Sequence, residues 1–408
     1  MKAQKEQSQR MLQGPLLPAI LSYTFPIILT SILQLLFNAA DLVIVGRWCG
    51  SVAVAAVGAT GAITNLIINL FIGLSVGAGV GVAHGLGSGD DESVHRTVHT
   101  AIPAAIVSGI FLTIVGVALS ETFLVWMDTP TENDVLKLAT LYMQIYFGGM
   151  VFNMVYNFAA SILRAAGDTK SPLIFLGLSG LINVGLNMIF VLACGMNVEG
   201  VALATVISQA VSAVLVVITL MRRTDACKLQ LNKLHFYKKQ FKKIVGLGLP
   251  AGIQSSMFAI SNVVIQSSIN SFGEVFMSGN AAAGNIGDFV GVISASFYQG
   301  SLNFTGQNIG AQQYKRAKQS VFVCMLCSSL ITLAASRLAI FFGQELLGVY
   351  IPDSQEAIDC GMIRLNIVCA YWFIAAIMDT TTGALRGMGA STVPMIIAAL
   401  GVCGIRIL

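Results

Sequence analysis

Three acidic residues lie inside long apolar stretches of this chain: Asp41, Asp288 and Asp379. A charged side chain at the centre of a bilayer costs about 2.5–3.5 kcal/mol on insertion scales, so such residues usually face a cavity or a partner. A carboxyl group in such a place is charged until it takes up one proton and becomes neutral. The three acids are therefore candidates for carrying protons or binding cations.

Asp41 ends a polar stripe. Gln34, Asn38 and Asp41 are spaced i, i+4 and i+7, which places them on one face of a helix. Pro26 lies earlier in the same apolar run, and a proline inside a helix removes one backbone hydrogen bond and permits a kink. This pattern fits a protonatable carboxylate on a hinged helix. It also fits an interfacial helix end at which Asp41 lies near Arg47.

Other polar side chains fall in apolar segments. Asn183 and Asn187 are four residues apart, and Thr205 lies on the next segment. Buried amides and hydroxyls of this kind often only tie helices together. From the residues alone, the candidates for proton or cation coupling are Asp41, Asp288 and Asp379.

The composition requires that these groups be positioned by membrane helices. Of 408 residues, 55% are hydrophobic and 10% are charged, whereas soluble domains carry roughly 25% charged residues. The apolar runs are about 20 residues long, which is the length of a spanning helix rather than of a barrel strand. We expect eleven spanning helices, at 15–38, 54–83, 97–121, 135–158, 170–193, 198–221, 241–269, 276–305, 316–342, 357–384 and 391–408.

Lys and Arg gather in alternate connections of this scheme, while the acids gather in the others. By the positive-inside rule, the Lys-rich connections and the N-terminus are cytoplasmic. The expected parts are a cytoplasmic segment (1–14), a first lobe of six helices (15–221), a basic cytoplasmic linker (222–240) and a second lobe (241–408).

The two halves of the chain are related by a repeat. The recurring pairs are 163–167 with 385–389, 85–87 with 308–310, and Pro26 with Pro250, and their offsets along the chain are nearly equal. In an apolar chain, a long repeat of this kind is typical of transporters with two pseudo-symmetric bundles. At this offset the sixth helix of the second half falls beyond residue 408. The fold class expected is therefore an all-α polytopic membrane protein of two six-helix bundles, truncated to about eleven of twelve helices.

The repeat pairs Asp288 with Asn65 and Asp379 with Asn157. Both lobes thus place polar groups at equivalent positions, and in the second lobe these groups are acids. A salt bridge is the alternative interpretation of either acid; its partner would be Arg337 or Arg364.

Metal sites are weakly indicated. His95 and His99 are four residues apart, which allows a metal site, but a solvated loop is the favoured interpretation. No resident metal or other cofactor is expected, although Na⁺ could bind at Asp41.

A set of motifs resembles the multidrug and toxic compound extrusion (MATE) family. The motifs are Pro26 followed by Asn38-x-x-Asp41-x-x-x-x-Gly46-Arg47, then Gly248-Leu249-Pro250-Ala251-Gly252-x-Gln254-Ser255, and Leu-Arg-x-x-Gly at 163–167 and 385–389. The resemblance covers about residues 14–408. It implies two six-helix lobes, a central cleft open to one side at a time, and export of cationic or amphiphilic compounds driven by inward H⁺ or Na⁺.

By this resemblance, Asp41 corresponds to the family's first-helix carboxylate and Pro26 to its hinge proline. Asn183 and Thr205 correspond to members of the polar cluster around that carboxylate. Asn187 stands where the well-studied archaeal and bacterial relatives have Asp. With these positions added, the candidates for proton or cation coupling are Asp41, Asn183, Asn187, Thr205, Asp288 and Asp379.

Three further positions depart from the family. Phe37 stands where several relatives have Tyr. Gln254 is near a position that is acidic in another branch, and Asp379 is one helical turn from that branch's tenth-helix Asp. The coupling site of that branch is therefore not reproduced intact.

The function expected is that of a secondary antiporter, not an enzyme, in a cell membrane. H⁺ is favoured over Na⁺ as the coupling ion because the fifth-helix acid is an Asn here. The candidate substrate-cleft residues are Gln34, Phe37, Asn38, Asn157, Gln254, Met257 and Tyr298. The expected partners are small cationic or amphiphilic molecules and the lipid bilayer, with no nucleic acid and a monomeric chain. The alternative is a lipid or lipid-linked oligosaccharide flippase of the same wider superfamily.

Overall fold

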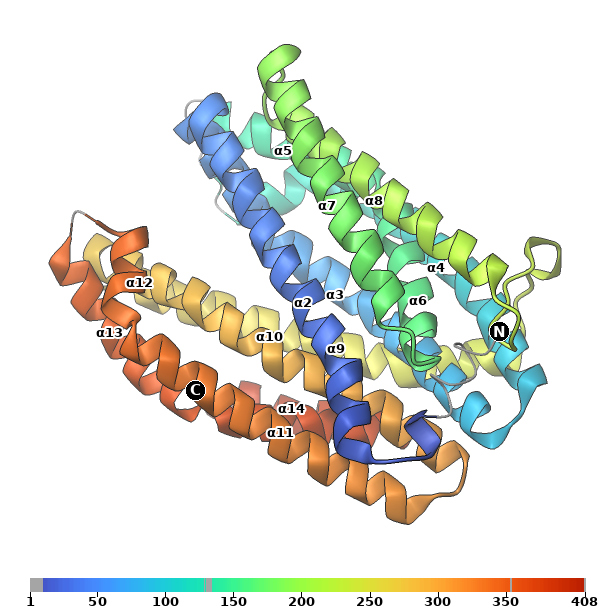
Figure 1. Cartoon of the computed structure of the whole chain (residues 1–408). Coiled ribbons are helices and arrows are strands. Elements are labelled where there is room, and N and C mark those ends of the chain that lie inside the picture. The colour runs from blue at the N-terminus through green and yellow to red at the C-terminus, as the bar shows by residue number, and fades with distance from the viewer. Residues whose placement is uncertain (1–9, 128, 130–133, 353, 407–408) are drawn as a thin grey trace.

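The computed structural model describes residues 10–127, 129, 134–352 and 354–406. The expected N-terminal segment lies largely outside these residues. Within them, all regular secondary structure is helical, as the hydropathy pattern predicts (Figure 1).

The helices of the first half follow the expected ranges. They are α2 (Leu16–Ile44), α3 (Ser51–Ser88), α4 (Asp91–Trp126), α5 (Val135–Gly148), α6 (Met150–Ala165), α7 (Lys170–Met188) and α8 (Val198–Arg222). Helices α2 and α7 each end in one π-helical turn, at Val45–Cys49 and Ile189–Ala193.

The second half repeats this order. Its helices are α9 (Lys238–Asn270), α10 (Glu274–Gly310), α11 (Tyr314–Phe341), α12 (Gly343–Tyr350), α13 (Gln355–Val368), α14 (Trp372–Gly387) and α15 (Thr392–Gly401). The short α12 is a helix that the hydropathy pattern did not predict.

Length and composition mark most of these helices as membrane spans. In the described part of the chain, 8 helices are long and apolar enough to cross a bilayer, and α5 with α6 forms a ninth candidate bent by 48°. The remaining two expected ranges fall on α10, whose many Ser, Asn and Gln residues lower its hydropathy, and on the short apolar α15. The protein is therefore a multi-pass helical membrane protein.

Glycines explain why the repeated Leu-Arg-x-x-Gly motif recurs. Gly167 and Gly389, its final residues, adopt φ of 88° and 93° just after α6 and α14 end. Glycine adopts this left-handed conformation without a Cβ penalty, and it commonly ends helices. The motif thus marks the same helix end in each half.

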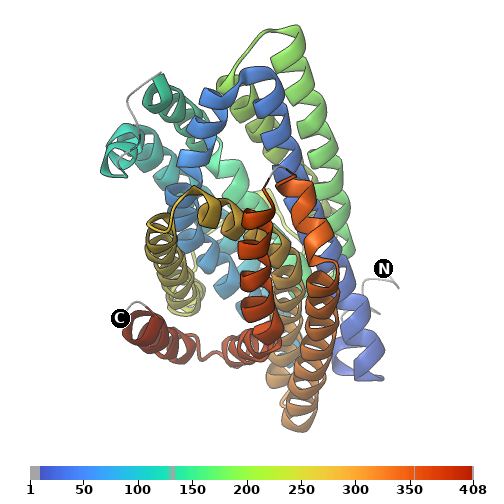
Figure 2. The same cartoon turned by 90° about the vertical axis from the view of Figure 1, so that its left-hand side faces the viewer.

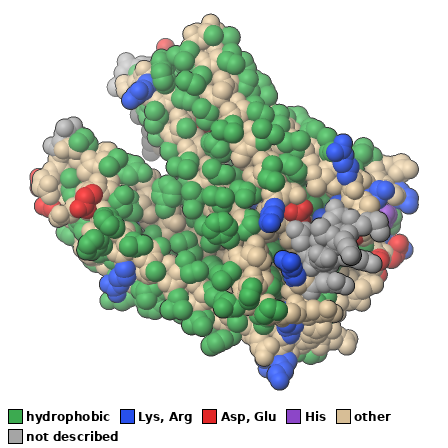
Figure 3. Space-filling view, in the orientation of Figure 1, with side chains coloured by type: hydrophobic (Ala, Val, Ile, Leu, Met, Phe, Trp, Pro, Cys, Tyr) green, Lys and Arg blue, Asp and Glu red, His purple; other side chains and the backbone are tan. Residues whose placement is uncertain are grey.

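The two halves form two lobes that diverge at one end and meet at the other (Figures 1 and 2). The space-filling view shows a hollow between the lobes at the upper left, near the turns that follow α12 (Figure 3). Hydrophobic side chains cover the middle of this face, and charged side chains gather toward its ends (Figure 3). This distribution suits a protein whose middle is surrounded by lipid.

Helix α9 of the second half packs closely on α3 of the first half. A Cβ added at Gly73 would lie 2.2 Å from the nitrogen of Gly252, and one at Gly77 would lie 2.2 Å from the carbonyl oxygen of Ile244. Small residues let the backbones of membrane helices approach this closely. Contact between the lobes therefore depends on glycine at these positions.

The linker between the halves is anchored to α4. The buried ring of His99 accepts a hydrogen bond at Nε2 from the backbone N–H of Gln230 over 3.0 Å, and its Nδ1 contacts the carbonyl oxygen of His95 at 2.8 Å. The interpretation of His95 and His99 as part of a solvated loop is therefore wrong for His99. No cluster that could hold a metal is found among the residues described.

Candidate functional site

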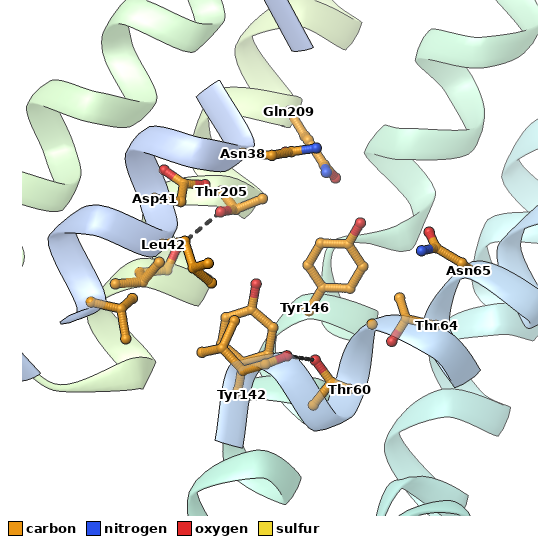
Figure 4. Close-up of a pocket in the computed structure, with 14 residues that line it drawn as sticks. Asn38, Asp41, Leu42, Thr60, Thr64, Asn65, Tyr142, Tyr146, Thr205 and Gln209 are labelled. Carbon is orange, nitrogen blue, oxygen red and sulfur yellow. Dashed lines mark hydrogen bonds between the residues drawn. The ribbon is translucent and has the colours of Figure 1, made fainter. Parts of the chain in front are cut away.

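A cavity of about 320 Å³ lies inside the first lobe, near the end at which the lobes diverge. Figure 4 shows its polar side chains, which come from α2, α3, α5 and α8. The lining residues are Asn38, Asp41, Leu42, Val45, Val57, Thr60, Gly61, Thr64, Asn65, Tyr142, Tyr146, Val201, Thr205 and Gln209. Asp41 is the one charged residue among them.

Asp41 is held by an amide from α7. Nδ2 of Asn187 donates a hydrogen bond of 2.6 Å to Oδ1 of Asp41, and it also lies 3.4 Å from Oδ1 of Asn183. Asn183 in turn donates to the hydroxyl of Thr205 on α8 over 3.3 Å. A single polar chain thus joins Asp41 to Asn187, Asn183 and Thr205 across three helices.

The alternative interpretation of Asp41 is an interfacial helix end near Arg47. Asp41 lies in the last turn of α2, but it lines the cavity, and no salt bridge to it occurs in the described part of the chain. Asn187 is fully buried, and its Oδ1 has no hydrogen-bond partner.

One wall of the cavity is aromatic. Tyr142 and Tyr146 lie one turn apart on α5, with ring centroids 6.2 Å apart and nearly parallel planes (Figure 4). Aromatic faces attract cations that approach within about 6 Å. Sequence reasoning did not include these two tyrosines, although their i, i+4 spacing in an apolar segment was a usable signal.

Several residues expected in a substrate cleft do not line this cavity. On α2, Asn38 lines it, whereas Gln34 and Phe37 do not. Phe37 packs on α7, where a Cβ at Gly180 would lie 1.9 Å from its ring. Asn157 bonds within its own helix, since its Nδ2 donates to the backbone oxygen of Asn153 over 2.9 Å.

Arg386 ties together two of the expected cleft residues of the second half. Its guanidinium donates to Oε1 of Gln254 over 2.7 Å and to the hydroxyl of Tyr298 over 2.5 Å. The sequence placed Arg386 in a connection between helices, but it belongs to α14 and its exposed fraction is only 5%. That placement was wrong because α14 continues through Arg386, whose side chain bonds to residues of α9 and α10. Met257, the third expected residue, is half-buried on α9.

The acids of the second half are not joined to this cavity. Asp379 accepts a 2.5 Å hydrogen bond from the hydroxyl of Ser294. Asp288 is exposed on α10, while Arg364 donates to Asn280 instead. The alternative interpretation, a salt bridge from either acid to Arg337 or Arg364, is wrong for the residues described, among which no such salt bridge occurs.

Helix α2 connects the cavity to the junction of the lobes. It continues without interruption through Pro26, between Asp41 and Tyr23. The hydroxyl of Tyr23 donates to the carbonyl oxygen of Arg164 over 3.0 Å and accepts from Asn303 of the second half over 2.8 Å. Asp41 and Tyr23 are about 27 Å apart along the helix at 1.5 Å per residue.

Two lobes of apolar helices around a hollow, with a polar cavity inside one lobe, define a polytopic membrane protein of the transporter class. The MatE family model matches residues 26–189 and 250–408, and the two stretches begin at Pro26 and Pro250, the paired prolines of the repeat. The chain belongs to the MatE family.

Known proteins support the same assignment. The probable multidrug resistance protein YpnP of Bacillus subtilis is 24% identical over 378 residues, which are 93% of this chain and 84% of that protein. A solved structure described as an outward-facing conformation of a multidrug resistance MATE family transporter superposes with a TM-score of 0.91. It is 20% identical, and the match covers 98% of this chain and 88% of that one. A MATE structure described as being in the bent conformation gives a TM-score of 0.87 at 21% identity, over 96% and 86% of the two chains.

Proposed function

We propose that this protein is a secondary antiporter that exports cationic or amphiphilic compounds in exchange for H⁺ or Na⁺, with H⁺ favoured. Asp41 carries the proposal. It is the one charged group of a cavity otherwise lined by amides, hydroxyls, phenols and apolar side chains, and it has no cation partner among the described residues. Such a carboxylate can hold either a proton or a cationic substrate, and the two would exclude each other.

The amide of Asn187 suits both states of this carboxylate. When Asp41 is charged, the Nδ2 group of Asn187 donates to it. When Asp41 is protonated, its hydroxyl is a donor, and Oδ1 of Asn187 is a buried acceptor without another partner. Rotation of the amide would let Asn187 serve either state. Na⁺, by contrast, needs several oxygen ligands, and here the nearest group presents N–H.

Helix α2 is the proposed link between protonation and the lobes. A change at Asp41 alters the bonds to α7 and α8, and Tyr23 lies on the same helix where the lobes meet. Pro26 lacks the N–H that would bond to the carbonyl of Ser22, so the helix can bend at modest cost near that end. A proton can shift such an equilibrium only through its differential affinity for the two states.

A cationic cargo fits the charge and the aromatic wall of the cavity. Asp41 supplies negative charge in surroundings of low dielectric, and Tyr142 and Tyr146 supply ring faces for cation–π contact. We further propose that the chain acts as a monomer in a cell membrane with its N-terminus in the cytoplasm. The Lys-rich connections, which lie at the end where the lobes meet, would then be cytoplasmic, and the hollow would face outward.

Efflux from proteoliposomes tests this proposal. Lipophilic cations of the ethidium type should leave the vesicles under an imposed pH gradient, and size-matched anionic dyes should not. Stronger binding of the anionic dye, or movement of lipid-linked oligosaccharide without a gradient, would favour the flippase alternative. Export that requires a Na⁺ gradient alone would reject H⁺ as the coupling ion.

A further inference from the structure

Two hydrogen bonds cross between the lobes at equivalent positions of the repeat. Nε2 of His84 on α3 lies 2.6 Å from the carbonyl oxygen of Gly387, and Nε2 of Gln307 on α10 donates to the carbonyl oxygen of Ala165 over 2.7 Å. The repeat pairs His84 with Gln307, and it pairs Ala165 with Gly387. Each half therefore donates from the same position to the same carbonyl of the other half.

Backbone contacts repeat this exchange. A Cβ added at Gly87 would lie 2.0 Å from the carbonyl oxygen of Gln307, and one added at Gly310 would lie 2.3 Å from the carbonyl oxygen of His84. Gly87 and Gly310 are also equivalent in the repeat. The last turns of α3 and α10 thus cross each other about a local pseudo-two-fold axis, with backbone against backbone.

The two accepting carbonyls are at helix ends. Ala165 is the last residue of α6 and Gly387 is the last residue of α14, and the final carbonyls of a helix have no donor within that helix. The donor Gln307 is fully buried and His84 is half-buried. Separation of the lobes at this end would leave these donors and acceptors without their partners.

We propose that His84 and Gln307 form a paired latch that holds the lobes together at this end and sets how readily they separate there. The latch rests on the proposed antiport function, because alternating access requires this end to open. His84 and Gln307 are positioning residues: they touch neither the Asp41 cavity nor its lining side chains. Their effect on transport would come through the balance between the two orientations of the lobes.

Distance measurements by electron paramagnetic resonance test the latch directly. Spin labels would be placed on exposed residues at this end, one at Glu92 and one at Lys315, in a cysteine-free full-length chain. His84→Ala and Gln307→Ala should each increase the population of long distances about fivefold, which is the usual effect of one net hydrogen bond. Gln307 is the donor at the equivalent position of the repeat, so His84→Gln should keep the distance distribution of the parent protein.

Two results would overturn the latch. One is an unchanged distribution in both alanine variants when these elute as monodisperse proteins. The other is a His84→Gln distribution shifted as far as that of His84→Ala, since the hydrogen bond would then not be the cause. The reciprocal exchange, His84→Gln with Gln307→His, provides a second variant that retains both donors should an alanine variant fail to fold.

This experiment separates the latch from the proposed function. The distances need neither substrate nor gradient. A shift in the alanine variants of a protein that transports no cation would retain the latch and reject the antiport proposal. Gradient-driven export with no shift in either alanine variant would reject the latch alone.

Discussion

Asn187 donates a 2.6 Å hydrogen bond to Asp41, and this contact joins the first helix of the chain to the polar residues of α7 and α8. The relatives that the motifs resemble have Asp at the position of Asn187, so the sequence indicated that the chemistry of this site differs from theirs. The amide gives Asp41 a neutral partner that can donate or accept. The first lobe therefore contains one titratable carboxylate in its cavity, not two.

Removal of this amide should impair transport. Asn187→Leu deletes the donor to Asp41, and hydrogen bonds to charged groups contribute about 1.5–3 kcal/mol, so gradient-driven export should fall at least about tenfold. Gln355→Leu is a suitable control, because Gln355 is exposed on α13 and its Nε2 donates to Asp359 of the same helix. Dye efflux from vesicles with equal protein content measures both. Equal rates in Asn187→Leu and wild type would remove Asn187 from the mechanism.

Pro26 should matter for movement rather than for folding. Pro26→Ala restores the donor to the Ser22 carbonyl and stiffens α2, so transport should fall about tenfold, within the usual range of conformational coupling, while thermal stability is kept or raised. Pro18→Ala provides the matched control, because Pro18 is in the first turn, where no helical bond is lost. Wild-type turnover in Pro26→Ala would mean that the bend plays no part.

Much of this architecture could be predicted from the sequence, because hydropathy and the repeat are properties of the chain itself. The helix ranges followed approximately from hydropathy, and the family resemblance implied polar neighbours for Asp41. The contact partners did not follow from the sequence. The rotation of α2 about its own axis decides which of its side chains face the cavity. A stripe of polar residues does not determine this rotation. The sequence therefore did not show that Asp41 meets α7 while Gln34 and Phe37 stay outside the cavity.

Arg386 shows the limit of charge counting. The positive-inside rule assigns a basic residue near a helix end to the cytoplasm, and it has no information on which helix ends are covered by neighbours. Here the Arg386 side chain is buried, and its guanidinium bonds to Gln254 on α9 and Tyr298 on α10. The second lobe thus has an internal cation that the composition did not suggest.

Loss of this internal cation should destabilise the second half. Arg386→Leu leaves buried Gln254 and the Tyr298 hydroxyl without their donor, at about 1.5–3 kcal/mol per lost bond to a charged group. Arg164→Leu, its half-buried equivalent in the first half, should cost less. The losses of stability in the two variants can be compared by measuring their apparent melting temperatures in detergent. A smaller loss for Arg386→Leu than for Arg164→Leu would contradict this role.

The cysteines report on the anchored linker. Burial and the nearby Asp225 carboxylate raise the pKa of Cys227 to about 12, so almost no thiolate forms near neutral pH. Cys194 is exposed after α7. Maleimide should label Cys194 well before Cys227 at pH 7.5, as measured by mass spectrometry of the peptides. Equally fast labelling of the two would show that the linker leaves α4 in solution.

Asp41 is the centre of the account, and one measurement tests it most directly. Proteoliposomes with equal amounts of wild type or Asp41→Asn would be loaded with ethidium and given a pH gradient. Asparagine imitates the protonated carboxyl permanently, so the account predicts folded protein whose gradient-driven efflux falls to the rate of empty vesicles. Wild-type efflux driven by the same gradient in Asp41→Asn would contradict it.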